Sequence, residues 1–125
     1  MRARDGARGQ LCDRVLYWSR RLKVEARIVR VQRMTRKWGS CSTTGIITLA
    51  EDLIQQEPGF QDFVIAHELL HLRVPTHGRL FKALITAYVP AWRQFDVERR
   101  RGETLRAARS ERLELRRLGR NRRRG

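Results

Sequence analysis

Residues 65–81 read IAHELLHLRVPTHGRLF and contain all three histidines of the 125-residue chain, His67, His71 and His77. Their confinement to one short window indicates a shared role, because a neutral imidazole is a metal ligand as well as a base. In an α-helix, residues four apart lie on the same face, so His67 and His71 present their rings in one direction. The spacing therefore predicts a helix that binds one metal ion.

Glu68 completes an HExxH pattern with these two histidines. It is rotated by about 100° from His67 around a helix of ~3.6 residues per turn, so it leans over the ion and does not join the pair as a ligand. That position suits a general base acting on water. Zinc in catalytic sites takes three protein ligands and one water. We therefore expect one zinc ion, with Glu68 as the catalytic residue.

His77 is the candidate third ligand. It stands six residues after His71, beyond Val74 and Pro75, where the helix ends because a residue before proline disfavours the α conformation. The metzincin pattern has the same spacing with a glycine at the position of Val74, so the match to it is partial. The alternative, that the histidines are satisfied core residues, leaves unexplained why no histidine stands elsewhere. We expect the chain to turn back and bring His77 to the pair.

The net charge of +15 is concentrated at the two ends of the chain. Residues 1–37 hold 12 basic and 3 acidic side chains, residues 98–125 hold 12 and 4, and the middle holds 4 and 6. This fits a near-neutral core whose termini bind nucleic acid weakly and without specificity, although arginine-rich ends could equally serve solubility. The predicted organisation is a disordered basic lead, a folded domain and a basic tail, over 1–10, 11–101 and 102–125.

Nothing in the sequence indicates a membrane or secreted protein. No apolar run approaches the ~20 residues of a membrane span. The basic start has no apolar stretch behind it of the kind found in secretory signals. Cys12 and Cys41 stand far apart and form no CxxC pair, so free thiols and a cytoplasmic localisation are expected.

Hydropathy patterns outline the remaining elements. Apolar residues at helical spacing predict four helices, over 11–22, 60–73, 78–88 and 91–101. The alternating stretch 26–34 and the β-branched stretch 46–50 predict two strands, which pair around turn-like residues 38–45.

Three segments together resemble a known family: TRKWGSCSTTGIITLAEDL, FVIAHELLHLRVPTHGRLFKAL and VPAWR. They are similar to the YgjP-type metal-dependent hydrolases, relatives of the SprT and Spartan zinc proteases, over about residues 27–96. The resemblance implies an α+β, minimal zincin-like domain. In such a domain a small antiparallel sheet packs beside the HExxH helix and further helices.

The same resemblance implies roles for individual residues. The implied zinc ligands are His67, His71 and His77, and the implied catalytic base is Glu68. The departures from the family pattern remove no ligand; they are Ala50, Leu70 and Thr76.

The segment before the HExxH helix offers candidate cleft residues. Trp38 is expected in the core or a pocket wall, while Ser40 and Cys41 could line the cleft through backbone groups, as an edge strand does when it binds an extended peptide. Cys41 could alternatively be a fourth zinc ligand, which would close the site and make it structural. Arg79 or Tyr88 could stabilise an oxyanion, and the sequence does not choose between them.

The function expected from these features is that of a zinc metallopeptidase, which cleaves peptide or protein substrates with a glutamate-activated water. Two alternatives stay open. The first is a metal-dependent nucleotide or phosphoester hydrolase, because such a zinc centre can hydrolyse bonds other than amide bonds. The second is a non-catalytic, zinc-stabilised nucleic-acid-binding module. An open coordination position beside Glu68 favours an enzyme, and a fourth protein ligand favours the module.

Overall fold

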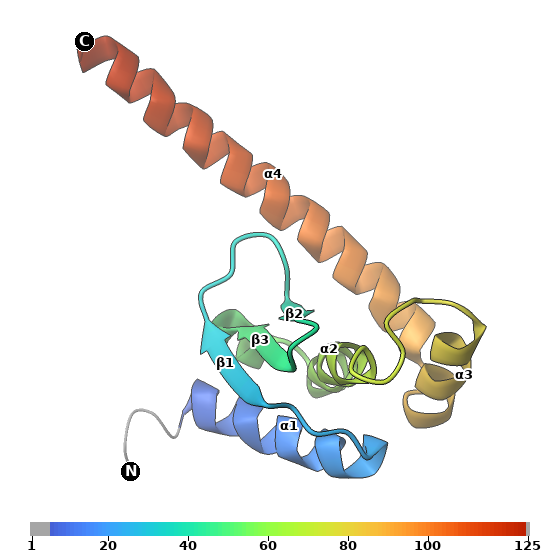
Figure 1. The fold of residues 1–125 in the computed structure, drawn as a ribbon. Coiled ribbons are helices and arrows are strands. Elements are labelled where there is room, and N and C mark those ends of the chain that lie inside the picture. Colours follow the sequence, from blue (N-terminus) through green and yellow to red (C-terminus); the bar gives the residue numbers. More distant parts are fainter. Residues whose placement is uncertain (1–5, 125) are drawn as a thin grey trace.

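The computed structural model describes residues 6–124, which form four α-helices, a three-stranded sheet and one 3-10 helix (Figure 1). In chain order these are α1 (Ala7–Leu22), β1 (Ile28–Gln32), β2 (Gly39–Cys41), β3 (Ile46–Ala50), η2 (Glu51–Gln55), α2 (Pro58–Leu70), α3 (Arg79–Tyr88) and α4 (Trp92–Arg124). None of these helices is long and apolar enough to cross a membrane. The α+β class expected from the sequence is confirmed.

Helix α2 is the centre of the molecule (Figure 1). It begins with Pro58 at a position where proline is favourable, because the missing N–H would lack a helical partner anyway. From Phe60 to Leu70 nearly every residue is buried, since α1, the sheet, α3 and α4 all contact this helix. The helix ends at Leu70, three residues before the predicted end, because residues 71–73 form turns.

Helix α1 packs on α2 through residues spaced four, three and four apart. These buried residues are Leu11, Val15, Trp18 and Leu22. Leu16, another apolar residue of the predicted helix 11–22, is 51% exposed. The helix begins at Ala7, so the predicted disordered lead is wrong for residues 7–10, and residues 1–5 lie outside the described part of the chain.

The sheet is mixed, whereas the sequence suggested an antiparallel one. Strand β3 lies in the middle, antiparallel to β2 and parallel to β1. The difference arises because residues 39–41, expected to be part of a turn, form a strand of their own, and the turn is confined to residues 42–45. Gly45 in this turn has φ +90°, which only glycine adopts readily. The hairpin therefore places β3 next to β1 and leaves β2 at the edge.

Helix α4 is 33 residues long, and its C-terminal half projects beyond the rest of the molecule (Figure 1). The domain boundary predicted at Gly102 falls inside this helix. Glu103 accepts a hydrogen bond from the backbone N–H of Trp38 at 3.1 Å. Arg106 pairs with Asp52 at 2.7 Å. The part of α4 up to Arg106 is therefore packed into the folded domain.

Candidate metal centre

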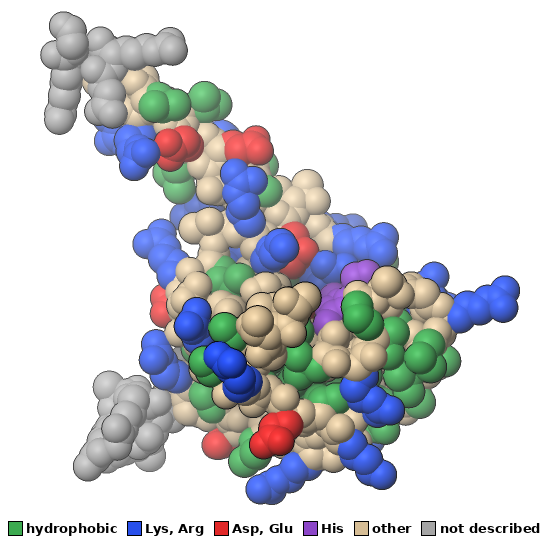
Figure 2. Space-filling view, viewed as in Figure 1, with side chains coloured by type: hydrophobic (Ala, Val, Ile, Leu, Met, Phe, Trp, Pro, Cys, Tyr) green, Lys and Arg blue, Asp and Glu red, His purple; other side chains and the backbone are tan. Residues whose placement is uncertain are grey.

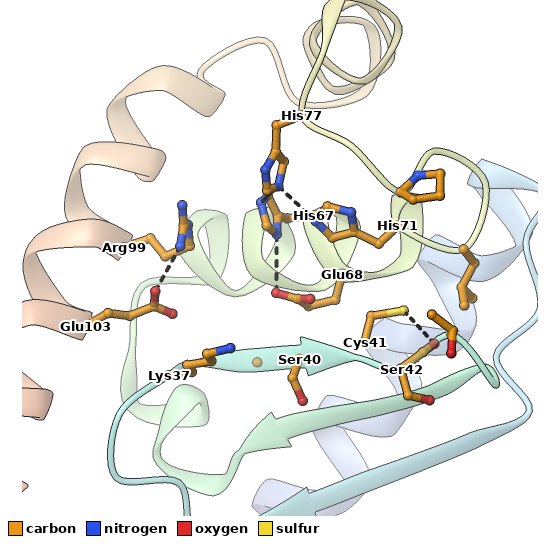
Figure 3. Close-up of a pocket in the computed structure, with 14 residues that line it drawn as sticks. Lys37, Ser40, Cys41, Ser42, His67, Glu68, His71, His77, Arg99 and Glu103 are labelled. Carbon is orange, nitrogen blue, oxygen red and sulfur yellow. Dashed lines mark hydrogen bonds and ion pairs between the residues drawn. The ribbon is translucent and has the colours of Figure 1, made fainter.

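The three histidines come together where α2 ends and the chain turns back. His67 lies in the last turns of α2 and is 7% exposed, and His71 caps the helix. The segment after it reverses direction and brings in His77 just before α3. The Nε2 atom of His77 lies 3.1 Å from Nε2 of His67 and 2.9 Å from Nε2 of His71 (Figure 3).

These Nε2 atoms form a donor set that fits a metal ion. A neutral imidazole has one N–H, so three ring nitrogens facing one another bring together lone pairs that hydrogen bonds satisfy poorly. A tetrahedral zinc ion with Zn–N of about 2.0–2.1 Å holds its ligand nitrogens ~3.3 Å apart, close to the observed separations. Within residues 6–124, this is the one group of His, Cys, Asp or Glu ligand atoms close enough to hold an ion.

The environment of the cluster keeps its more exposed histidines neutral. Burial lowers the pKa of His71 and of His77 below the ordinary value of 6.5, and the nearby His67 lowers each pKa further. Both rings are therefore neutral near pH 7. A neutral ring is the form whose nitrogen lone pair binds a metal.

Phe81 of α3 forms one wall of the cluster. It is 3% exposed, and its ring centroid lies 5.3 Å from that of His67 and 4.9 Å from those of His71 and His77. An aromatic ring in this place excludes water from one side of the imidazoles and restricts their rotation. No sequence pattern predicted a role for Phe81. Its one signal was its position in the same window as the histidines.

Glu68 lies between α2 and β2, on the cleft side of the histidines (Figure 3). Its Oε2 atom is 3.2 Å from Nδ1 of His67. With the proton on Nδ1, that nitrogen donates to the carboxylate and leaves the Nε2 lone pair of His67 directed at the cluster. Gly39 of β2 makes room for this arrangement, because a Cβ there would lie 3.1 Å from Cγ of Glu68.

An open cleft of about 510 Å³ is lined by the histidines, Glu68 and β2 (Figure 3). The structure places Ser40 and Cys41 in its wall. Trp38 lies in the core instead, 7% exposed and edge-to-face with Phe60 at 5.7 Å. Arg79 and Tyr88, the two candidates for oxyanion stabilisation, do not line this cleft.

The thiol of Cys41 is outside the histidine cluster. Its Sγ donates a hydrogen bond to the backbone oxygen of Ser42 at 3.5 Å. Burial raises the pKa of Cys41, and the Glu68 carboxylate raises it further, so the thiol is protonated at neutral pH. Its sulfur is not part of the group of ligand atoms that His67, His71 and His77 bring together, so the geometry does not favour Cys41 as a fourth ligand.

Helix α4 contributes a charged wall that the sequence analysis missed. Arg99 and Glu103 both line the cleft, and the guanidinium of Arg99 donates to Glu103 at 2.9 Å and to Asp96 at 2.8 Å. These residues stand about thirty positions after the HExxH helix, in an arginine-rich stretch without a recognisable motif. Their proximity to the histidines is a tertiary feature that local sequence patterns do not carry.

The fold is similar to those of two solved metallopeptidases. The crystal structure of the zymogen of Methanocaldococcus jannaschii jannalysin aligns with a TM-score of 0.63 and 19% identity, covering 70% of this chain and 91% of that chain. The zymogen of Pyrococcus abyssi abylysin aligns with a TM-score of 0.55 and 22% identity, covering 61% and 76%. No curated protein sequence matches the chain significantly.

These likenesses define the class of fold, a small α+β domain of the zincin-like type. The sequence narrows this further. A family model described as YgjP-like, metallopeptidase domain, matches residues 3–99, so the chain belongs to the YgjP-like family. The family resemblance drawn from the sequence is confirmed, while the relationship to SprT and Spartan stays a prediction.

Proposed function

We propose that this chain is a zinc-dependent metallopeptidase that cleaves peptide or protein substrates with a water molecule activated by Glu68. The observation that carries the proposal is that three histidine Nε2 atoms come together, with that of His77 lying 3.1 Å from that of His67 and 2.9 Å from that of His71. A buried carboxylate lies beside them, and all of these groups line one open cleft. Membership of a metallopeptidase family supports the same reaction class.

His67, His71 and His77 would hold the ion through Nε2. A bound zinc ion would supply Lewis acidity, polarising the scissile carbonyl and lowering the pKa of a water molecule. Glu68 would take a proton from that water and deliver it to the leaving amine. Its carboxylate is suited to this because it is 8% exposed and lines the cleft that the histidines line.

The edge strand β2 is the proposed binding surface for the substrate backbone. Among the described strands β2 pairs with β3 alone, and Figure 3 shows it as the strand nearest the histidines. An extended peptide can add to such an edge through main-chain hydrogen bonds. The backbone of Ser40 and Cys41 would then hold the peptide across the cleft, with its scissile bond near Glu68.

The alternatives drawn from the sequence have less support. A structural zinc site needs a fourth protein ligand, and no fourth His, Cys, Asp or Glu joins the cluster in the described part of the chain. No feature of the cleft favours a nucleotide over a peptide. The cytoplasmic localisation stays a prediction, in keeping with the two free cysteines.

Metal analysis combined with a peptide assay tests the proposal. We expect about one zinc per purified chain after dialysis, and less than about a tenth of that in His67→Ala, because two histidines alone form a weak site. Internally quenched peptides should be cleaved, a chelator should stop cleavage, and added zinc should restore it. Arg112→Ala, an exposed change on α4, serves as the matched control. Full zinc retention by His67→Ala would contradict the assigned site.

A further inference from the structure

A second hollow adjoins the metal centre between α3 and the N-terminal part of α4. We call it the α3–α4 hollow; it has a volume of about 340 Å³ and shares His67, His77 and Arg99 with the cleft. Figure 2 shows basic side chains gathered beside the histidine patch, where α4 crosses the molecule. A substrate side chain next to the scissile bond could therefore enter this hollow.

The hollow has a positive charge that its own ion pairs do not cancel. Arg99 and Arg100 both bind Asp96, at 2.8 Å and 3.1 Å, and Arg99 also binds Glu103. These two arginines and two acids balance one another. The remaining cations are Lys82 of α3 and Arg93 of α4, and neither forms an ion pair within residues 6–124.

An aromatic residue positions Arg93, and two aromatic rings give the hollow an apolar wall. The guanidinium carbon of Arg93 lies 4.6 Å from the ring centroid of Trp92. The indole N–H of Trp92 donates to Thr86 at 2.8 Å, and the Thr86 hydroxyl donates to the backbone oxygen of Lys82 at 2.6 Å. This chain of contacts joins α4 to α3 beside the hollow. Phe81 and Trp92 supply surface that methylene groups can contact.

We propose that the α3–α4 hollow is a specificity subsite for an acidic side chain, glutamate or aspartate, at one position next to the scissile bond. The carboxylate would meet Lys82 and Arg93, and its methylenes would contact Phe81 and Trp92. A neutral side chain would form no ion pair with these two cations, and a basic side chain would be repelled by them. The inference rests on the proposed peptidase activity, which supplies the substrate.

The test uses the full-length zinc-loaded chain and one set of internally quenched peptides, acetylated and amidated so that no terminal carboxylate contributes. Each position within three residues of the scissile bond is varied among Glu, Gln and Lys. We expect one position at which kcat/KM for Glu exceeds that for Gln by about tenfold, the order of the combined effect of two solvent-exposed charge pairs. A ratio near one at every position would overturn the proposal.

Charge-reversal variants test whether Lys82 and Arg93 cause the preference for a Glu peptide. In Lys82→Glu combined with Arg93→Glu, the Glu preference should disappear and the Lys peptide should exceed the Gln peptide. Lys82→Gln with Arg93→Gln should abolish the Glu preference without reversal, which covers the case in which the reversed variant folds poorly. Arg112→Glu, an equally exposed cation of the projecting part of α4, should leave the wild-type ratio unchanged. A Glu preference that survives both double variants would show that another surface selects the substrate.

A binding measurement separates this proposal from the peptidase proposal. If the wild-type chain cleaves no peptide, the peptidase proposal fails, and the subsite is judged by fluorescence anisotropy of labelled Glu and Gln peptides on zinc-loaded Glu68→Gln. We expect the Glu peptide to bind about tenfold more tightly at low salt, with a smaller ratio at high salt and none in the double variants. Equal Kd values for the two peptides would overturn the subsite.

Discussion

Glu68 is the residue at which the metal centre and the cleft meet. Glu68 is 8% exposed, its carboxylate accepts a hydrogen bond from His67, and its side chain lies so close to β2 that a Cβ at position 39 would be 3.1 Å from its Cγ. A carboxylate held between the ring of His67 and an open cleft can orient that ring and can act as a base toward a water molecule in the cleft. Accepting the hydrogen bond from His67 requires only an oxygen atom, whereas acting as a base requires the charged carboxylate.

Replacing Glu68 with glutamine separates these roles. The amide oxygen can still accept from Nδ1 of His67, so we expect the zinc content to stay near that of the wild-type chain. The base is lost, so hydrolysis of quenched peptides should fall by ~100-fold or more. Glu111→Gln on the exposed part of α4 is the matched control. Release of zinc from Glu68→Gln would show instead that Glu68 is a ligand.

The sequence revealed those site residues whose relation is local. The spacing of His67, Glu68 and His71 on one helix, and a proline turn before His77, could be read without a structure. Phe81 and Arg99 could not, because they reach the site through the packing of α3 and α4 on α2. Hydropathy periodicity reports the buried face of a helix but does not identify the helix that covers it.

At the scale of elements, two of the differences from expectation involve Trp38 and its neighbours. Strand β2 is only three residues long and consists of Gly, Ser and Cys, which have little β propensity, so its extended form depends on pairing with β3. Gly102 suggested the end of a helix. In the structure it lies inside α4, where a Cβ would be 2.8 Å from Nε1 of Trp38. The extended form of β2 and the continuation of α4 through Gly102 therefore both depend on tertiary contacts.

A pair of glycine substitutions in α4 tests that contact. Alanine in place of glycine in a helix normally stabilises by about 1 kcal/mol. At Gly102 the new methyl group would press on the buried ring of Trp38, so we expect Gly102→Ala to lower the free energy of unfolding by about 1–2 kcal/mol. Gly119 has no atom within 4 Å of such a Cβ, so Gly119→Ala should be neutral or stabilising. Urea unfolding measures both, and equal shifts would mean that Trp38 does not restrict Gly102.

At the scale of the whole molecule, part of the basic charge at the two ends serves the fold. Arg8 donates to the backbone oxygen of Val31 at 2.9 Å, and Arg14 pairs with Asp62 at 2.7 Å. Arg99 likewise holds α4 together beside the cleft. Fewer positive charges are therefore available to polyanions than the sequence count suggests. Weak nucleic-acid binding through the two basic termini stays a prediction.

Two truncations locate the end of the folded domain. A chain that ends after Gly102 loses Glu103 and Arg106, and with them the hydrogen bond to Trp38 and the ion pair with Asp52. A chain that ends after Leu113 keeps both contacts. Because hydrogen bonds to charged groups contribute roughly 1.5–3 kcal/mol each, we expect the shorter chain to lose at least about 2 kcal/mol of unfolding free energy. The longer chain should stay within about 0.5 kcal/mol of the full one.

Urea unfolding followed by circular dichroism measures these free energies, and Glu103→Gln with Arg106→Gln in the full-length chain supplies the control. That double variant should reproduce most of the loss, because it removes the charged contacts and keeps the helix. Strand β2, which forms one wall of the cleft, follows directly after Trp38. Peptide cleavage should therefore decline both in the chain that ends after Gly102 and in the double variant. If the chain ending after Gly102 were as stable as the full chain, the domain would end where the sequence suggested. The contacts of α4 with Trp38 and Asp52 would then contribute nothing measurable to the stability of the domain.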